Sequence, residues 1–371
     1  MRGLVKWVAR AAGVVAGSVV ALVAASVGAA LPAPPMPRTL AVPAAPPLCT
    51  GARDRKATYR WPLRPFDREH PLRGAFGDPR TVERSDQALD GPLSIGSFTF
   101  HNGIDIVARD GTPVYPVVSG IAVIRHTHEV SVHTDGFRIF QYWHIDPWVK
   151  TGQRVIAGET ILGTVQHGKH HLHFGEISSM RAVNPLARGQ LGPYRDTGVP
   201  AVVALLARAG NGRNMPLARL HGRIELIADA LDAQPLRFGG PWSDKPVSPA
   251  LVRWQLERSD GVVVRPWRTA VDFRLHEPPS AQFWQTYATG TYQNFPVLSN
   301  HLDWGKPGRY LYRLTREPID TRPLPNGRYV VVVEAGDVCG NRGRLEQRVT
   351  VANDNGTGTR LPAALLPLRA R

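Results

Sequence analysis

Histidines are concentrated in one stretch of this 371-residue chain. Nine of the thirteen lie between His101 and His173. Three groups stand out within that stretch: His101-Asn-Gly-Ile-Asp105, Tyr142-Trp-His144 and His170-His-Leu-His173. A catalytic zinc ion takes three protein ligands from His, Asp, Glu or Cys, and it leaves a fourth position to water. These groups therefore predict a metal site of the hydrolytic kind.

The spacing of the candidate ligands sets conditions on the backbone. His171 and His173 are two residues apart in a strand-like segment, so both side chains lie on one face, about 6.6 Å apart along the strand. One can bind a metal ion while the other serves the bound water. In a fully extended strand His101 and Asp105 would be about 13 Å apart, too far to share one ion. The chain must curl between them, and Gly103 permits the curl because glycine tolerates positive φ.

The remaining histidines of the stretch divide into two classes. His144 ends an alternating strand, and it can enter the same pocket as an acid–base group or as a donor to developing charge. His126, His128 and His133 are interpreted as packed or solvated side chains without a direct role. An alternative for the whole histidine-rich run is a loose metal-buffering tract.

The elements that must position these residues read as β-strands. Asp135-Gly136 is a two-residue hairpin signal between two of them, and no amphipathic helix is evident in residues 59–195. The expected strands are 112–124, 130–133, 137–145, 154–165 and 171–177.

A second β region is expected over residues 196–352. Turn signals at Asp260-Gly261 and Asn326-Gly327 separate short strands, a pattern typical of a β-sandwich. Periodicity leaves 199–206 open as a strand or a short helix. Residues 277–307 are aromatic and are expected to form a loop-like insertion, and 353–371 a flexible tail. The expected strands are 223–228, 252–257, 262–267, 310–315 and 329–334.

The N-terminus indicates export. Arg2, Lys6 and Arg10 precede an apolar run over residues 11–31, which is typical of a secretory signal but also long enough to anchor the chain in a membrane. Residues 1–31 are therefore a signal peptide or an N-terminal membrane anchor. Residues 32–58 follow as a proline-rich linker, expected to be a stiff spacer without a core.

Charge and cysteine content add two weaker constraints. The formal net charge is +15, and only six of the 45 basic residues are lysines. Such a chain favours anionic polymers, or it reflects a biased genomic composition. Nucleic-acid binding rests on charge alone, because no nucleic-acid module is recognisable. In an oxidising compartment the two cysteines, Cys49 and Cys339, are expected to form a disulfide.

Taken together, the motifs resemble the LytM/lysostaphin-type zinc endopeptidases of peptidase family M23 over residues 59–190. The segment Arg73-Gly-Ala-Phe-Gly77 is similar to that family's opening motif. The other matching segments, in order, are His101-Asn-Gly-Ile-Asp105-Ile106, Gly111-Thr-Pro-Val, Gly120, Tyr142-Trp-His144, Gly152-Gln-Arg-Val, Gly158 and His171-Leu-His-Phe174.

The resemblance implies a role for each matching residue. His101, Asp105 and His173 would bind one Zn²⁺ per chain. His171 would be the general base or orient the water, and His144 would stabilise the transition state or share the proton work. The metal would acidify its water and polarise the scissile carbonyl. Lys169-His170 departs from the family pattern just before this motif, which puts the substrate preference in doubt; Gly175 before Glu176 is a further departure at a position that binds no metal.

The resemblance also implies a fold: a LytM/lysostaphin-type antiparallel β-sheet peptidase domain over 59–195. Residues 196–352 resemble, more weakly, an immunoglobulin-like or fibronectin-type β-sandwich. The segments that carry this are Asp196-Thr-Gly-Val-Pro-Ala-Val-Val, Gly222-Arg-Ile-Glu-Leu-Ile-Ala-Asp229 and Val333-Glu-Ala-Gly-Asp-Val-Cys-Gly-Asn341. In this region Asp229 and Asp232 either cap turns or bind calcium.

The function predicted from these observations is hydrolysis of peptide cross-links or bridges in peptidoglycan by an exported zinc metalloendopeptidase. The expected location is the periplasm or the outside of the cell. Two alternatives stay open. The chain is a non-catalytic wall-binding or amidase-activating protein, or it is a secreted protease that acts on other proteins.

Overall fold

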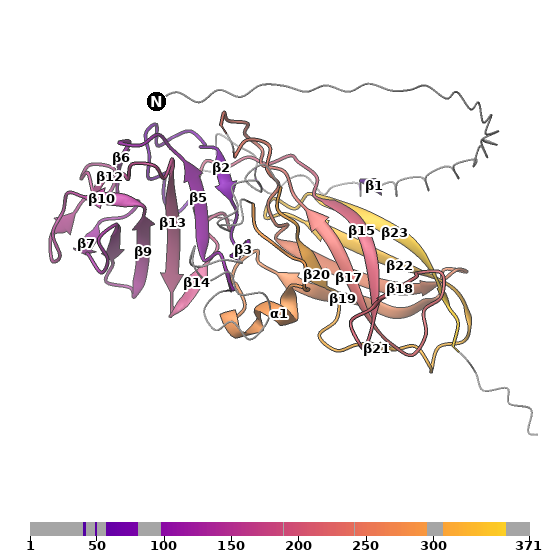
Figure 1. Cartoon of the computed structure of the whole chain (residues 1–371). Helices are drawn as coiled ribbons and strands as arrows, with labels where there is room; N and C mark the ends of the chain where they lie inside the picture. Colours follow the sequence, from indigo (N-terminus) through magenta and orange to yellow (C-terminus); the bar gives the residue numbers. More distant parts are fainter. Residues whose placement is uncertain are drawn as a thin grey trace, which may run out of the picture. The chain divides into compact units, whose positions relative to one another are not determined.

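The computed structural model describes residues 40–41, 49, 57–80, 98–187, 189–240, 242–294 and 307–353. All of them belong to one compact unit that spans residues 37–371. Their regular secondary structure is almost entirely β-strand, with a short α-helix, α1 (Phe283–Thr286), and a 3-10 turn at Ser280–Gln282 (Figure 1). The predicted mainly β fold class is therefore confirmed.

The predicted N-terminal signal or anchor, residues 1–31, lies outside the described residues, as does the predicted tail beyond Asn353. Where the structure does describe the chain, none of its helices combines the length and the apolar character that crossing a membrane requires.

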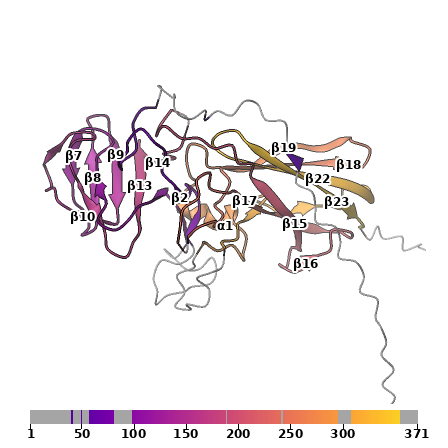
Figure 2. The same ribbon diagram turned by 90° about the horizontal axis from the view of Figure 1, so that it is seen from above.

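An eight-stranded sheet carries most of the candidate site residues. Its central strands run in the order β8-β9-β13-β5-β2, each antiparallel to its neighbour (Figures 1 and 2). Leu172 and Phe174 point from β13 into the hydrophobic core. His171 and His173 alternate with them and therefore lie on the opposite face. The strands are β2 (Leu72–Gly74), β5 (Gly103–Val107), β7 (Gly120–Val123), β8 (Glu129–His133), β9 (Arg138–Trp143), β11 (Arg154–Val155), β13 (His171–Ser178) and β14 (Arg181–Val183).

The hairpin signal at Asp135-Gly136 is located correctly, but its turn is longer than two residues. His133 of β8 pairs with Ile139 of β9, and the Thr134 amide donates to the Arg138 carbonyl at 3.1 Å. Phe137 adopts a left-handed φ of 56°. The loop therefore closes through an additional left-handed residue, which the dipeptide signal does not specify.

Two smaller sheets flank the large one. The first contains β6 (Pro113–Val114), β12 (Gly163–Val165) and β10 (Ile145–Pro147). The second pairs β3 (Pro79–Arg80) with β4 (Thr99–Phe100). Because β4 ends at Phe100 and β5 begins at Gly103, the chain leaves one sheet and enters another within the His101-Asn102 step.

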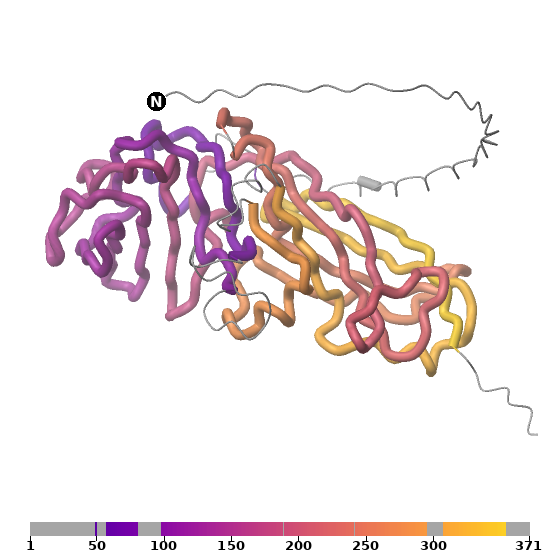
Figure 3. The backbone as a smooth tube through the Cα atoms, in the orientation of Figure 1, coloured from indigo at the N-terminus to yellow at the C-terminus, as the bar shows by residue number. Residues whose placement is uncertain are grey.

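Residues 196–353, the C-terminal region, contribute two further antiparallel sheets, drawn in rose, orange and yellow along the tube of Figure 3. The segment 199–206, left open by periodicity, is part of strand β15. One sheet contains β16 (Asn214–Met215), β15 (Ala201–Ala209), β17 (Arg223–Leu231), β20 (Leu311–Arg313) and β21 (Ile319–Asp320). The other contains β1 (Leu40–Ala41), β23 (Arg342–Val351), β22 (Gly327–Gly336), β18 (Leu251–Arg258) and β19 (Val263–Asp272). An immunoglobulin-like topology and a domain boundary at residue 195 stay predictions.

Two expectations about connecting segments need correction. The proline-rich linker is not only a spacer, because β1 adds an edge strand to β23 and Cys49 forms the predicted disulfide with Cys339. The aromatic segment that begins at 277 was expected to be a loop-like insertion, but its described part contains the 3-10 turn Ser280–Gln282 and the helix α1. Phe283 and Tyr287 are fully buried there. Aromatic side chains have large apolar surfaces, so their burial lowers the free energy of the folded state strongly.

The C-terminal region is joined to the β3-β4 sheet and to the segment before it through a buried contact. Phe100 of β4 packs against the rings of Phe273 and Phe283 at centroid distances of 5.6 and 5.4 Å. Beside them the Asp78 carboxylate, 3% exposed, accepts hydrogen bonds from the Ser248 amide and hydroxyl. The segment 72–80, which borders the candidate site, is thereby attached to the C-terminal region.

Candidate metal centre

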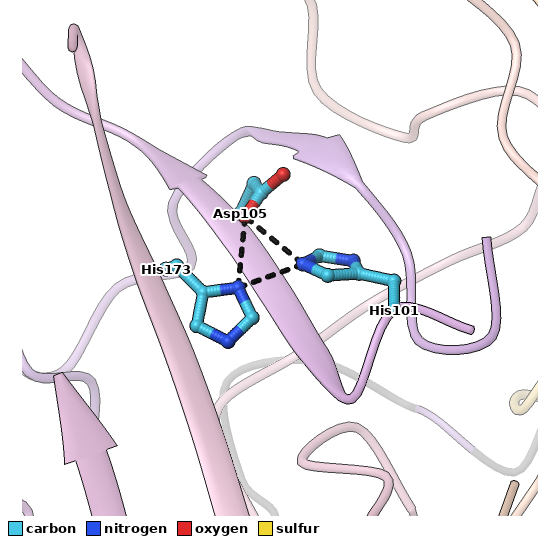
Figure 4. A group of neighbouring side chains, drawn as sticks. All are labelled: His101, Asp105 and His173. Atoms are coloured by element: carbon cyan, nitrogen blue, oxygen red, sulfur yellow. Dashed lines mark hydrogen bonds and ion pairs between the residues drawn. The ribbon is translucent and has the colours of Figure 1, made fainter. Parts of the chain in front are cut away.

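The structure brings three of the predicted site residues into direct contact (Figure 4). His101 Nε2 lies 2.8 Å from His173 Nδ1 and 3.1 Å from Asp105 Oδ1, and the last two atoms are 3.2 Å apart. In tetrahedral coordination with bonds of 2.0–2.2 Å, neighbouring ligand atoms are about 3.3 Å apart. The three distances, 2.8–3.2 Å, lie slightly below this spacing, so the atoms are grouped closely enough to be ligands of one ion.

The orientation of the rings also fits a metal. His101 Nδ1 donates to the Ala75 carbonyl at 2.8 Å, so its Nε2 lone pair is directed at the other two atoms. Such a second hydrogen bond fixes the tautomer of a metal-binding imidazole. All three residues are buried, with exposed fractions of 4%, 8% and 9% for His101, Asp105 and His173. Among the described residues this is one of two groups that can hold a metal ion.

Gly103 serves the site in a different way from the one expected. It lies in strand β5 and does not adopt positive φ, so the predicted left-handed curl is wrong. The bend falls instead at His101-Asn102, where the chain passes between sheets. Gly103 is needed for close approach, because a Cβ there would lie 2.4 Å from the Phe174 carbonyl oxygen and 2.9 Å from the His173 ring.

A methyl group at this position should therefore disturb the site. We expect Gly103→Ala to lower the free energy of unfolding by about 1–3 kcal/mol, because β5 and β13 must separate, and to weaken zinc binding by about 10- to 100-fold. Denaturant unfolding and competition with a chromogenic chelator measure the two effects. Gly136→Ala is the control, since its Cβ has open space. Wild-type zinc affinity in Gly103→Ala would contradict the expectation.

Arg80 holds the second oxygen of Asp105. Its Nη2 donates to Asp105 Oδ2 at 2.9 Å, while its Nη1 lies 3.9 Å from Asp78 Oδ2. Asp105 therefore presents only Oδ1 to the other two candidate ligands. The guanidinium orients this carboxylate in the way that hydrogen bonds outside the ligand set orient metal ligands.

His171 and His144 lie beside the three residues. Their ring centroids are 4.5 Å apart, and His171 Nε2 is 3.7 Å from Asp105 Oδ1. His171 Nδ1 donates to the Lys169 carbonyl at 2.7 Å, which leaves Nε2 as an acceptor on the side of the site. His144 follows β9 in a left-handed conformation with φ of 64°, and this turns its ring toward His171. The five predicted residues therefore converge, and their roles stay predictions.

The electrostatics keep these side chains in the forms that metal binding requires. Burial, with a smaller contribution from Arg80, lowers the pKa of His101 to about 3, and burial lowers the pKa of His144 to about 4. Burial alone would raise the pKa of Asp105, but His101, His171 and Arg80 outweigh it and hold that pKa well below its usual value. At neutral pH His101 is therefore neutral and Asp105 is ionised, as metal ligands must be, and His144 beside them is neutral as well.

The other histidines of the stretch take no part in this cluster. His126 stacks on Trp143, and His128 contacts Asp146 and Gln166. His167 and His170 both pair with Asp110 at the surface.

Sequence reasoning missed Arg80 as a contact of the site, and it named Arg73 only as part of a motif. Arg73 Nη2 lies 3.2 Å from His171 Nε2, and its guanidinium stacks on Trp242 of the C-terminal region. Arg73 and Trp242 are 169 positions apart, so no local sequence pattern could predict their contact.

The second group that can hold a metal ion is Asp196, Asp232 and Asp337, all buried in the C-terminal region. Of the pair considered for calcium, Asp229 instead accepts a hydrogen bond from Arg309, and Asp232 accepts one from the adjacent Ala233 amide. Burial raises the pKa of all three clustered carboxyls, that of Asp337 to about 7, and their mutual repulsion adds to the effect for Asp232 and Asp337.

These raised pKa values make stability depend on pH. The folded state keeps protons on these carboxyls that the unfolded chain releases near the ordinary aspartate pKa of 3.8. Their contribution to stability is therefore complete below that pH and is lost as the pH rises toward 7. We expect a loss of about 1.4 kcal/mol per pH unit for each such proton. Urea unfolding between pH 4 and 8 with chelator present measures it. Asp337→Asn should flatten the profile, and an unchanged slope in that variant would rule out this origin.

Comparison with known proteins identifies the segment that carries the metal centre. The family model named Peptidase family M23 matches residues 99–185, which include all five predicted site residues. This chain carries a peptidase family M23 domain. The M23 domain belongs to a family of peptide hydrolases, as the motifs predicted. No curated protein matches the chain in sequence.

Three of the solved structures that are similar to part of this chain cover about a third of it. One is the SpoIIQ-SpoIIIAH pore forming complex, with 19% identity over 35% of this chain and 90% of that one, at a TM-score of 0.26. Another is Csd3 of Helicobacter pylori, with 24% identity over 32% of this chain and 34% of that one, at a TM-score of 0.24. A third is a zinc containing peptidase of Vibrio cholerae, with 22% identity over 34% of this chain and 40% of that one, at a TM-score of 0.23.

Proposed function

We propose that this protein is an exported zinc metalloendopeptidase that hydrolyses peptide cross-links or bridges of bacterial peptidoglycan. The observation that carries the proposal is the convergence of His101, Asp105 and His173 at the spacing of zinc ligands inside an M23 domain. Export is supported by the basic and apolar N-terminal segment and by the disulfide between Cys49 and Cys339, which is typical of oxidising compartments.

The residues fit a zinc ion better than a harder metal. Two imidazole nitrogens and one carboxylate oxygen form the donor set of a catalytic zinc site, which keeps a fourth position open. Magnesium and calcium prefer oxygen ligands. A zinc ion held by this set would supply Lewis acidity toward the scissile carbonyl and a water that is more acidic than bulk water.

The chain's own residues account for the proton transfers. His171 Nε2 carries a lone pair, because Nδ1 holds the proton that bonds the Lys169 carbonyl, and this lone pair accepts from Arg73 Nη2 at 3.2 Å. As the water oxygen forms its bond to the carbonyl carbon, His171 Nε2 accepts the water proton. It then delivers that proton to the leaving nitrogen as the carbon–nitrogen bond breaks. His144, beside His171, is placed to donate a hydrogen bond to the oxygen on which negative charge develops.

Digestion of defined sacculi tests the proposal. Purified full-length protein with zinc is expected to release peptide fragments that mass spectrometry identifies by the bond cleaved. Chelation should stop the release, and added zinc should restore it. Binding to sacculi without release, unaffected by the chelator, would instead identify a non-catalytic wall-binding protein. If the protein cleaves casein but releases no peptides from sacculi, it is instead a protease that acts on other proteins.

A further inference from the structure

Arg73 occupies a position next to the reacting groups of the proposed mechanism. It lies in β2, and its Nη1 donates to the Lys169 carbonyl at 3.2 Å. Its Nη2 lies 3.2 Å from His171 Nε2, which itself is 3.7 Å from Asp105 Oδ1. The guanidinium therefore lies beside the place where the substrate carbonyl must enter.

This guanidinium has hydrogen-bonding capacity left over. Arginine carries five N–H donors, and Arg73 Nε is buried without a partner. The nearby Asp105 is bonded by Arg80 instead, and within the described ranges no carboxylate forms an ion pair with Arg73. Burial lowers the pKa of Arg73 to about 10, so it stays charged at neutral pH. Asp105 is the opposite charge that acts on Arg73, but it is bonded to Arg80 and not to Arg73. A half-buried cation that lacks a bonded carboxylate is costly, and a bound carboxylate would lower that cost.

The C-terminal region holds Arg73 in a defined plane. The Trp242 ring centroid lies 4.1 Å from Arg73 Cζ, a stacking distance for a cation on an aromatic face. Stacking occupies the face of the guanidinium, and on its edge one N–H of Nη1 bonds the Lys169 carbonyl and one of Nη2 bonds His171, which leaves the remaining N–H groups for a ligand. The edge is the part that binds a carboxylate through two parallel hydrogen bonds. Trp242 thus pre-organises the donor group.

We propose that Arg73, stacked on Trp242, is a specificity-determining residue that binds a free carboxylate next to the scissile bond of the substrate peptide. This inference rests on the proposed function and names the substrate class: acidic cross-linked peptides rather than uncharged bridges. A carboxylate that takes up the Arg73 N–H groups also releases His171 Nε2, the atom that must accept the water proton. Recognition of the acidic substrate and release of the base are then one event.

Two synthetic cross-linked peptides test this directly. They differ only in whether the carboxylate beside the scissile bond is free or amidated, and kcat/KM is measured for both with zinc-loaded full-length protein. We expect the wild type to prefer the free carboxylate by about 10- to 100-fold, the range of a hydrogen bond to a charged group. Arg73→Gln should reduce the preference to about one, and Arg73→Lys should retain part of it because the charge remains without the fork. Trp242→Ala should lower it about 2- to 5-fold.

Arg181→Gln is the matched control. It removes the same charge from the exposed start of β14, and it should keep the full preference. A wild-type protein that cleaves both peptides equally, or an Arg73→Gln variant that keeps the preference, would overturn the proposal. Calorimetry with the His144→Ala variant separates recognition from catalysis. One further outcome is that the variant binds the peptide with the free carboxylate more tightly than the amidated one while the wild type cleaves neither. In that case the carboxylate site stands and the proposed peptidase function fails.

Discussion

The His173→Ala variant is expected to lose zinc binding and the release of peptide fragments together. Two ligands cannot hold the ion in the geometry that three provide, and the metal supplies several kcal/mol of transition-state stabilisation. We expect the rate of fragment release to fall by roughly a thousandfold or more. The rate from sacculi and the zinc content by mass spectrometry are measured on the same preparations.

A histidine outside the cluster provides the control, which shows whether any His→Ala substitution lowers activity. His126 is exposed and stacks on Trp143 outside the cluster, so His126→Ala should keep both the metal and the activity. His101→Ala should behave like His173→Ala, because its Nε2 contacts both of the other ligand atoms. A His173→Ala protein that keeps the wild-type rate and is insensitive to chelation would contradict the assignment of the metal centre.

The largest effect on stability is expected from Asp78→Ala. The Asp78 carboxylate accepts hydrogen bonds from the Ala75 amide and from the Ser248 amide and hydroxyl, and both Asp78 and Ser248 are buried. Removing it leaves three donors without partners, each at a cost of about 1–3 kcal/mol. We expect the free energy of unfolding to fall by about 3 kcal/mol or more, as measured by urea denaturation.

Asp78→Ala should also affect catalysis, because Arg80 loses a neighbouring carboxylate and orients Asp105 less firmly. Ser248→Ala removes only the hydroxyl bond and should cost about 1 kcal/mol. Asp67→Ala, at an exposed position in the same region, should leave stability unchanged. If Asp78→Ala unfolds at the same urea concentration as Asp67→Ala, the contact with the C-terminal region does not contribute as argued.

The chemistry of the candidate site could be predicted from the sequence alone. Residue types and order identify His101, Asp105, His144, His171 and His173, because few side chains bind metals and because alternation in a strand places i and i+2 on one face. The sequence also predicted the β character of the chain and the pairing of Cys49 with Cys339, since only two cysteines are present.

Tertiary structure decided how those residues are held. Gly103 was expected to curl, but it is extended, since what it must provide is room for the Phe174 carbonyl in the next strand. A spacing pattern describes one segment and carries no information about which other segment packs on it. For the same reason the contacts of Arg73 with Trp242 and of Asp78 with Ser248 could not be predicted. They join residues 169 and 170 positions apart, and only the packing of the C-terminal region against the segment 72–80 brings them together.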